Sequence, residues 1–400
     1  MKQSNQTVSK WCLVSMASIP LVMTLGNSML IPALPLIEQQ LRISAFKSSL
    51  LITCYSIASI LLIPIAGFLS DKFGRKKIIL PSLAIVLIGG LISGIAASKM
   101  EDPYWMIIFG RILQGIGASG AAPIVLPLIG DLYRNDDDAS SALGIIETSN
   151  TFGKVLSPVL GAVFASIVWY LPFYLISLFS LISLILICIF VKTPKKKITS
   201  IPMNKFLANA KKIFHKEGRW LYTLFIVGGF VMFILFSLQV FLSSHLETQF
   251  HLKGVKKGLV LAIPLLFLCI SSLVSGKLIK GNKQIMKKII IAGLLLQAVT
   301  LTFFKEYDSL FLLLTIISLN GIAIGSILPT LDALITENIE KSQRGLITSF
   351  YSSARFIGVA AGPPFMSMLI KKDLTIATYS AAIITLYLTW LVIRKIQVNE

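Results

Sequence analysis

Charged and polar side chains that can bind a proton or a cargo lie inside an apolar segment, residues 140–166. Glu147, Asn150 and Lys154 fall within it, and Thr151 lies beside them. If this segment is a helix, the seven residues from Glu147 to Lys154 span two turns, roughly 10 Å, and the side chains share one face. Glu147 is the only acid that we place well inside such a segment. A carboxyl group shielded from water suits a proton carrier, and Lys154 can hold it ionised until cargo or proton arrives. A static ion pair is the alternative.

The other reactive residue types do not form the patterns of an enzyme or a metalloprotein. The four cysteines, Cys12, Cys54, Cys188 and Cys269, lie in apolar runs without metal-ligand spacing. The sequence shows no Ser-His-Asp set, phosphate-binding loop or metal-ligand cluster. We therefore predict that the protein is not an enzyme and holds no metal or cofactor.

The composition indicates that lipid surrounds much of the chain. Of 400 residues, 55% are hydrophobic and 14% are charged, whereas about a quarter are charged in a soluble domain. A net charge of +19 is high enough to suggest nucleic acid, but the basic residues lie in short gaps between apolar runs. There they set the orientation of a membrane protein. We predict a lipid bilayer, and no nucleic acid, as partner.

Twelve apolar segments are long enough to cross a membrane as helices, for which about 20 residues suffice. They are residues 11–35, 46–70, 78–98, 104–129, 140–166, 169–191, 219–244, 257–279, 286–305, 309–334, 345–370 and 374–394. The most basic gaps, 71–77, 192–218 and 276–288, share one side in this topology. The positive-inside rule places them and both termini in the cytoplasm of a cell-membrane protein. Three lysines do not follow this rule, because the topology places them on the outer side of the membrane: Lys253, Lys256 and Lys257.

The two halves of the chain repeat each other. Gln114-Gly115-Ile116 and Asn320-Gly321-Ile322 open similar stretches, each with a proline nine residues after its first residue. The repeat predicts an all-α membrane protein of two pseudo-symmetric six-helix bundles, residues 1–191 and 219–400, joined by a basic linker, 192–218. Two bundles around a central cavity are the architecture of alternating access, for which a monomer suffices.

A second group of candidate residues lies between the second and third segments. The run Gly67-Phe-Leu-Ser-Asp71-Lys-Phe-Gly74-Arg75-Lys76-Lys offers one glycine for close helix approach, one for a tight turn, and charges that can pair. Asp131, at the end of the fourth segment, is a third partner. The run resembles the loop signature of the major facilitator superfamily, which implies its twelve-helix fold and a small-molecule substrate. The residues predicted to act in conformational gating are Gly67, Asp71, Gly74, Arg75, Lys76 and Asp131.

Two further runs extend the resemblance. Arg111-Ile-Leu-Gln114-Gly115 resembles a second family signature, whose arginine is associated with proton coupling. An arginine inside a membrane helix costs at least ~2.5–3.5 kcal/mol on insertion scales, so it should face the bundle interior. Gly153-x-x-x-Ser157-Pro158-x-x-Gly161 resembles the antiporter signature, which brings helices together through small residues and a proline kink. The family form has glycine where Ser157 and Ala162 stand.

The first segment resembles that of the drug/proton antiporter branch through Ser28-Met-Leu-Ile-Pro32-Ala-Leu-Pro35. Asn27 and Ser28 stand where this branch often has an acid, so its usual proton carrier is missing. Proton coupling is therefore assigned to Glu147, Arg111 and Lys154. The predicted substrate cavity contains Asn27, Gln114, Asn150, Gln239 and Arg355. Arg355 meets an anionic cargo or Glu147 across the cavity, or packs against backbone carbonyls.

The resemblance implies a proton-coupled exporter of small amphiphilic molecules, a multidrug efflux protein driven by the proton gradient. Lys154, Arg111 and Arg355 make the predicted cavity cationic, which argues against strongly cationic dyes. An anionic cargo, such as a siderophore or a lipid-linked compound, is therefore an alternative. A proton-coupled uptake symporter is a further alternative, which the antiporter signature disfavours. Nothing catalytic in the sequence supports a membrane sensor or enzyme.

Overall fold

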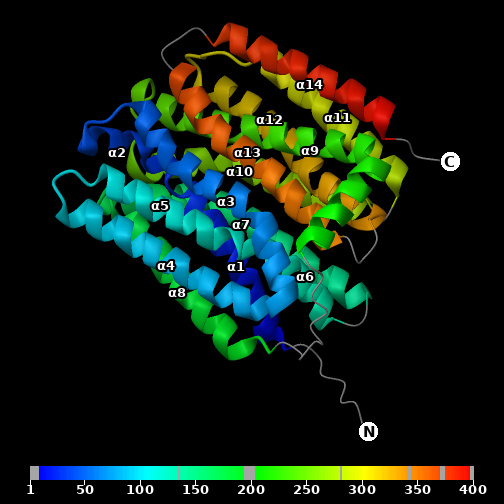
Figure 1. Ribbon diagram of the computed structural model, residues 1–400. Helices are drawn as coiled ribbons and strands as arrows, with labels where there is room; N and C mark the ends of the chain where they lie inside the picture. The colour runs from blue at the N-terminus through cyan, green and yellow to red at the C-terminus, as the bar shows by residue number, and fades with distance from the viewer. Residues whose placement is uncertain are drawn as a thin grey trace.

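The structure, a computed structural model, describes residues 9–133, 136–192, 203–279, 282–339, 344–369 and 374–396, and the side chains of these residues except 136–141, 203–217 and 344. All elements in these ranges are helices (Figure 1). In chain order they are α1 (Lys10–Ser28), η1 (Ile31–Ala33), α2 (Leu34–Leu41), α3 (Ala45–Phe73), α4 (Arg75–Lys99), α5 (Tyr104–Ser119), α6 (Ala122–Leu132), α7 (Asp136–Ile167), α8 (Leu171–Phe190), α9 (Met203–Thr248), α10 (Gly254–Ile279), α11 (Lys283–Thr302), α12 (Leu310–Asn338), α13 (Arg344–Leu369) and α14 (Thr375–Lys395).

Eleven helical segments in the described residues are long and apolar enough to cross a membrane. The other predicted crossing is α13, which has 26 residues and so is long enough, but which carries many polar and small side chains. It packs between α3 and α9. This position shields its polar residues from lipid, which explains why a crossing helix can be less apolar than its neighbours.

Two of the predicted crossings are interrupted, each next to proline. The first divides into α1, η1 and α2 around Pro32 and Pro35, and the fourth divides into α5 and α6 just before Pro123. Proline has no backbone N–H and cannot complete the hydrogen bond to the residue four positions earlier. The interruptions leave backbone groups of α1 and α5 available to other partners.

The helix α9 is much longer than the predicted seventh crossing. It contains 46 residues, a length of roughly 69 Å. Its first turns, residues 203–217, belong to the predicted linker, whose residues 193–202 lie outside the described ranges. The boundary that the sequence places between linker and second bundle therefore stays a prediction.

The helices form two bundles. Two buried cores hold α1 to α8 together. A third core holds α9 to α14 together and also includes Ile31, Leu34 and Ile52 of the first bundle. Between the bundles, α3 packs on α13 and α7 packs on α10. In Figure 1 the first bundle, blue to green, lies below the second, green to red.

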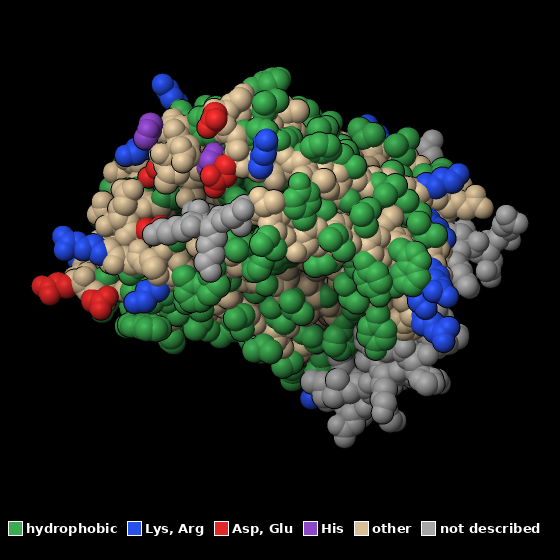
Figure 2. All heavy atoms as spheres, turned by 90° about the horizontal axis from the view of Figure 1, so that it is seen from above, with side chains coloured by type: hydrophobic (Ala, Val, Ile, Leu, Met, Phe, Trp, Pro, Cys, Tyr) green, Lys and Arg blue, Asp and Glu red, His purple; other side chains and the backbone are tan. Residues whose placement is uncertain are grey.

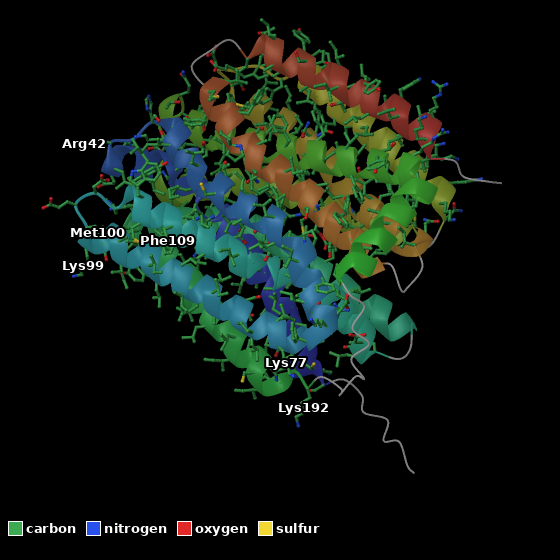
Figure 3. All side chains as sticks on the ribbon, in the orientation of Figure 1. Arg42, Lys77, Lys99, Met100, Phe109 and Lys192 are labelled. Carbon is green, nitrogen blue, oxygen red and sulfur yellow. The ribbon has the colours of Figure 1, made fainter. Side chains whose placement is uncertain are left out.

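Charged side chains gather towards the two ends of the bundles, and hydrophobic side chains cover much of the surface between them (Figure 2). We call one end the linker end, where Lys77 and Lys192 lie, and the other the α2 end, where Arg42, Lys99 and Met100 lie (Figure 3). Large apolar side chains between the ends are exposed, including Leu61, Phe109 and Ile383. Such a belt is expected where lipid surrounds the protein.

Candidate functional site

An ion pair between two helices of the second bundle lies at the centre of the candidate site. Arg355 Nη1 on α13 donates to Oδ1 and Oδ2 of Asp332 on α12, at 3.2 and 3.3 Å. The two side chains are 16% and 28% exposed, so both remain partly accessible. The guanidinium also lies over the ring of Tyr351, 5.6 Å from its centroid. Asp332 and Tyr351 together fix the orientation of Arg355.

Asp332 is a candidate site residue that sequence reasoning missed. The prediction that Glu147 is the only acid well inside a crossing is wrong, because α12 continues for six residues beyond Asp332. Its neighbours Leu331, Leu334 and Ile335 are buried. The feature of the sequence that could have indicated Asp332 is an acid within an apolar run, 23 residues before Arg355. In the described hydrogen bonds Arg355 pairs with this acid, and not with Glu147 or backbone carbonyls.

The polar face of α7 faces this ion pair from the first bundle. Asn150 Nδ2 donates to Glu147 Oε1 at 3.2 Å, and Asn150 Oδ1 accepts from Thr24 Oγ1 on α1 at 2.6 Å. Lys154 interacts electrostatically with Glu147, Asp332 and Arg355. The structure therefore brings four predicted residues together, all of them half-buried: Glu147, Asn150, Lys154 and Arg355.

We call Glu147, Lys154, Asp332 and Arg355 the ion cluster. It contains two acids and two cations, so its formal charge is zero. The expectation of a cationic cavity is therefore wrong for this cluster. Asp332 offsets Arg355, and Arg111, the third cation of that expectation, lies elsewhere.

Arg111 is fully buried between α1, α3 and α5. Its Nε donates to the Leu51 carbonyl at 2.8 Å, and its Nη1 donates to the Gly26 carbonyl at 2.9 Å and to Gln114 Oε1 at 2.6 Å. Its guanidinium lies 4.7 Å from the centroid of the Tyr55 ring. Arg111 therefore faces the bundle interior, as the insertion cost of a charged side chain predicts. Its assignment to proton coupling stays a prediction.

Two other residues of the predicted cavity lie with Arg111 and not in the ion cluster. Asn27 follows Gly26, whose carbonyl accepts from Arg111, and Gln114 accepts from Arg111 directly. In the described residues, Asn27 Oδ1, Gln114 Nε2 and Arg111 Nη2 are buried without a hydrogen-bond partner. Buried polar atoms of this kind are usually satisfied by water or by a ligand. The predicted cavity thus divides into separate polar regions.

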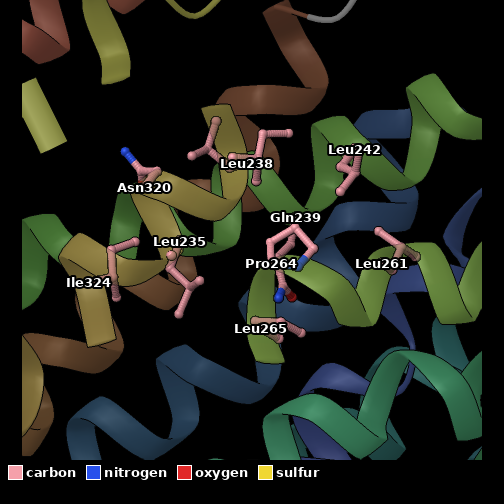
Figure 4. Close-up of a pocket in the computed structure, with 11 residues that line it drawn as sticks. Leu235, Leu238, Gln239, Leu242, Leu261, Pro264, Leu265, Asn320 and Ile324 are labelled. Carbon is pink, nitrogen blue, oxygen red and sulfur yellow. The ribbon is translucent and has the colours of Figure 1, made fainter. Parts of the chain in front are cut away.

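Gln239 lines a third region, a small cavity of about 20 Å³ between α9, α10 and α12 (Figure 4). The residues around it are mostly apolar: Leu235, Leu238, Leu242, Leu261, Pro264, Leu265, Ile317, Asn320, Gly321 and Ile324. Along α12, Ile324 precedes Asp332 by eight residues, or roughly 12 Å towards the α2 end. The cavity therefore offers an apolar surface two turns from the ion cluster.

The antiporter signature lies where α7 packs on α1. A Cβ at Gly161 would overlap the carbonyl oxygen of Met29, and a Cβ at Gly153 would lie 3.2 Å from the side chains of Leu21 and Thr24. At Gly161 only glycine permits this approach of the two backbones, and at Gly153 a larger residue would displace the neighbouring side chains. The signature glycines therefore set the distance between α1 and the polar face of α7.

The two departures from the family form of this signature are accommodated differently, Ser157 within α7 and Ala162 by a glycine of the opposite bundle. Ser157 is buried and bonds back to the Gly153 carbonyl at 2.7 Å. A Cβ at Gly258 on α10 would lie 2.6 Å from Ala162 Cβ and 2.7 Å from the Pro158 carbonyl oxygen. Here α10 supplies the glycine that a close contact between α7 and α10 requires.

Replacing Gly161 with alanine is expected to lower the free energy of unfolding by about 1–3 kcal/mol, the usual cost of overpacking. Gly144→Ala, on the same helix, is the matched control, because a Cβ there has no atom within 4 Å. It should leave stability unchanged or raise it by about 0.4–1 kcal/mol. Thermal unfolding in detergent measures both, and equal midpoints would contradict the close α1–α7 contact.

Three of the residues predicted to act in gating form a network at the linker end. Arg75 pairs with Asp71, and Arg75 Nε lies 3.4 Å from Asp131 Oδ2 on α6. Its Nη1 donates to Ser70 Oγ at 2.6 Å. Gly74 has φ 102°, a value that favours glycine and permits the turn between α3 and α4. The predicted network of Asp71, Arg75 and Asp131 is therefore present.

Two other residues predicted to act in gating contact different partners. A Cβ at Gly67 would lie 2.9 Å from Ser349 Oγ on α13, so this glycine lets the two bundles approach at the linker end. Lys76 Nζ donates to the carbonyls of Cys188 and Val191 at 2.9 and 2.7 Å. Lys76 therefore caps the end of α8 and lies outside the carboxylate network.

Comparisons with known proteins agree with this architecture. The family profile described as Major Facilitator Superfamily matches residues 16–287 and 240–399. The chain is 49% identical, over 363 residues and 90% of both chains, to the Bacillibactin exporter of Bacillus subtilis. It is 24% identical to Multidrug resistance protein 2 of the same organism, over 88% of this chain and 86% of that one.

A solved structure shows the same fold. The crystal structure of the human organic anion transporter MFSD10 matches with a TM-score of 0.73, covering 97% of this chain and 100% of that one. Its sequence identity is 17%. The likeness therefore concerns the arrangement of the helices.

Proposed function

This chain belongs to the major facilitator superfamily, and we propose that it exports a siderophore from the cell in exchange for protons. It is a multi-pass membrane transporter and not an enzyme. The observation that carries the cargo proposal is the 49% identity, over 90% of both chains, to a protein named Bacillibactin exporter. An alignment of that extent spans both bundles, and thus the regions that a cargo must cross.

The proposed orientation follows the charge distribution. The linker end carries the basic gaps between helices, so we place it and both termini in the cytoplasm. The α2 end then faces outward from the cell membrane. A single chain contains both bundles, and we propose that it acts as a monomer.

The sign of the coupling restricts how the cargo binds. Antiport requires the proton and the cargo to weaken each other's binding. Hydroxyl or amide groups of a cargo that donate to Asp332 or Glu147 meet this requirement, because protonation removes the accepting carboxylate. An anion bound only to Arg355 does not, because protonation of Asp332 frees Arg355 and strengthens anion binding. An iron-free siderophore, which carries hydroxyl groups where iron would bind, fits the first case.

Asp332 is the coupling acid that the geometry favours. It is partly accessible and hydrogen-bonded to Arg355, so a proton and a cargo donor compete for the same oxygens. Glu147 bonds to Asn150 and lies on the opposite bundle. We propose that Asp332 carries the proton, that Arg355 and Lys154 hold the unprotonated state, and that Glu147 and Asn150 bind cargo.

Inverted vesicles with an acidic interior are expected to accumulate iron-free bacillibactin when they contain this protein. The proton gradient drives the exchange, so an uncoupler should abolish accumulation. Iron-loaded bacillibactin should accumulate far less, because its metal-binding oxygens no longer donate. Accumulation measured by mass spectrometry checks both statements. Equal transport of the loaded form would contradict binding through donors, and no transport of either form would contradict the cargo.

Multidrug efflux is a second candidate, which the apolar side chains around Gln239 favour. The relatives named for multidrug resistance are distant, at 24% identity for the one described above. The same vesicles distinguish the two proposals, because a lipophilic dye should accumulate in place of bacillibactin if drugs are the cargo. The exporter name of the relative at 49% identity favours export over uptake by symport.

A further inference from the structure

A buried lysine joins the two bundles at the α2 end. Lys257 is 2% exposed, and its Nζ donates to the Pro32 carbonyl at 3.1 Å and to Glu247 Oε2 at 2.8 Å. Pro32 belongs to the first bundle, whereas Lys257 and Glu247 belong to the second. From the sequence, Lys257 is expected to lie with Lys253 and Lys256 on the outer side of the membrane, against the positive-inside rule. The structure gives Lys257 a place inside α10 instead.

Two further hydrogen bonds cross between the bundles beside this lysine. Ser243 on α9 is 1% exposed, and its Oγ donates to the Ile31 carbonyl at 3.0 Å. Gln39 Nε2 on α2 donates to Glu247 Oε1 at 3.3 Å. Glu247 thus bonds to both bundles and keeps Lys257 directed at Pro32.

The proline run at the start of the chain explains why these carbonyls accept. In a helix the Ile31 carbonyl would bond to the N–H of residue 35, and in a tighter 3₁₀ turn the Pro32 carbonyl would do the same. Residue 35 is proline and has no N–H. The Ile31 carbonyl accepts from the Leu34 N–H in the 3₁₀ turn, and Ser243 adds a second donor to it, while Lys257 donates to the Pro32 carbonyl. Ser243 and Lys257 therefore stabilise this segment from the opposite bundle.

A close contact between α7 and α10 holds the lysine in position. Gly258, the next residue, approaches Pro158 and Ala162 of the antiporter signature, as described above. One turn earlier, a Cβ at Gly254 would lie 3.5 Å from Ser166 Cβ. The start of α10 is therefore pressed against the first bundle, and Lys257 has little freedom to choose another partner.

We propose that Lys257 and Ser243 form the outer gate of the transporter, which closes by bonding the Pro32 and Ile31 carbonyls. That this gate faces outward rests on the orientation given under the proposed function. When the bundles part at the α2 end, Lys257 keeps Glu247 but loses Pro32. Opening therefore separates the Lys257 ammonium group from the Pro32 carbonyl while Glu247 still pairs with the charge. The closed state is stabilised by a charged hydrogen bond, and the open state leaves no unpaired charge.

The distance between two spin labels across the α2 end tests this gate in liposomes without any cargo. The labels replace Glu101 and Lys305, which are exposed on the first and second bundles. They are placed in a chain whose four cysteines are changed to serine. Lys257→Met is expected to raise the ratio of wide to narrow distances about tenfold, equivalent to about 1.4 kcal/mol. Lys256→Met, a neighbouring exposed lysine, should leave the distribution unchanged.

Further variants separate the gate from a folding defect. Ser243→Ala removes the second bond and should shift the distribution in the same direction, whereas Lys257→Arg should restore the narrow distance. The double variant Lys257→Met, Glu247→Gln removes the ion pair without leaving an unpaired acid. Its distance distribution should still shift to wide distances. An unchanged distribution in Lys257→Met and Ser243→Ala would overturn the gate. Because no cargo is present, a failure to transport bacillibactin has no bearing on this result.

Discussion

Asp332→Asn is expected to uncouple export from the proton gradient while leaving the protein folded. Asparagine keeps the size of the side chain and can still accept a hydrogen bond from Arg355, but it cannot bind a proton. The proton and the cargo then no longer compete, and the coupling free energy, typically 1–3 kcal/mol, is lost. Accumulation of bacillibactin in acid-loaded inverted vesicles should fall roughly 10- to 100-fold. Exchange of labelled for unlabelled cargo without a gradient should continue.

Two variants show whether the proton resides on Asp332. Asp332→Glu keeps a carboxyl group next to Arg355 and should retain part of the driven export. Glu147→Gln should weaken cargo binding and leave the number of protons exchanged per cargo molecule unchanged. The opposite result, in which Glu147→Gln uncouples and Asp332→Asn does not, would return proton coupling to Glu147, as the sequence alone suggested.

The helices were predictable because membrane crossing imposes a simple pattern. A crossing needs a long apolar run, and the chain has such runs at nearly all positions where the structure has helices. The start of α9 does not follow from the crossing pattern, because residues 203–217 are too polar to register as a crossing. The breaks at Pro32 and Pro123 follow from the missing N–H of proline, but a proline such as Pro158 lies inside a continuous helix. Proline alone therefore does not decide where a helix ends.

The candidate site was less predictable, because partners across helices leave no local pattern. The polar face of α7 could be read from the spacing of Glu147, Asn150 and Lys154 within one helix. The pairing of Arg355 with Asp332 joins two helices, and no spacing rule connects α12 with α13. Lys257 looked like a misplaced loop charge for the same reason, since its acceptor lies 225 residues away in the chain.

Arg111→Leu is expected to destabilise the folded protein strongly. The substitution removes the donor of the Gly26 carbonyl and of the Gln114 amide oxygen, and one of two donors to the Leu51 carbonyl, which lies inside α3. Each buried acceptor without a partner costs about 1–3 kcal/mol, so the free energy of unfolding should fall by roughly 3 kcal/mol or more. Arg111→Lys should be intermediate, because an ammonium group cannot reach carbonyls on α1 and α3 with the fixed geometry of a guanidinium. Thermal unfolding in detergent measures the loss, with Lys99→Leu at an exposed position as the control.

The same variants decide how Arg111 contributes to proton coupling. A guanidinium does not release its proton in proteins, so Arg111 can act on coupling only through the helices it holds. The Gly26 carbonyl precedes Asn27 on α1, and Thr24 of the same helix bonds to Asn150 beside Glu147. Arg111 therefore positions the helix against which the polar face of α7 packs. If so, the Arg111→Lys protein that folds should exchange as many protons per cargo molecule as the native protein. A folded, thermally stable Arg111→Leu protein with a lower proton ratio would instead place Arg111 in the proton path, as the resemblance to the family signature implies.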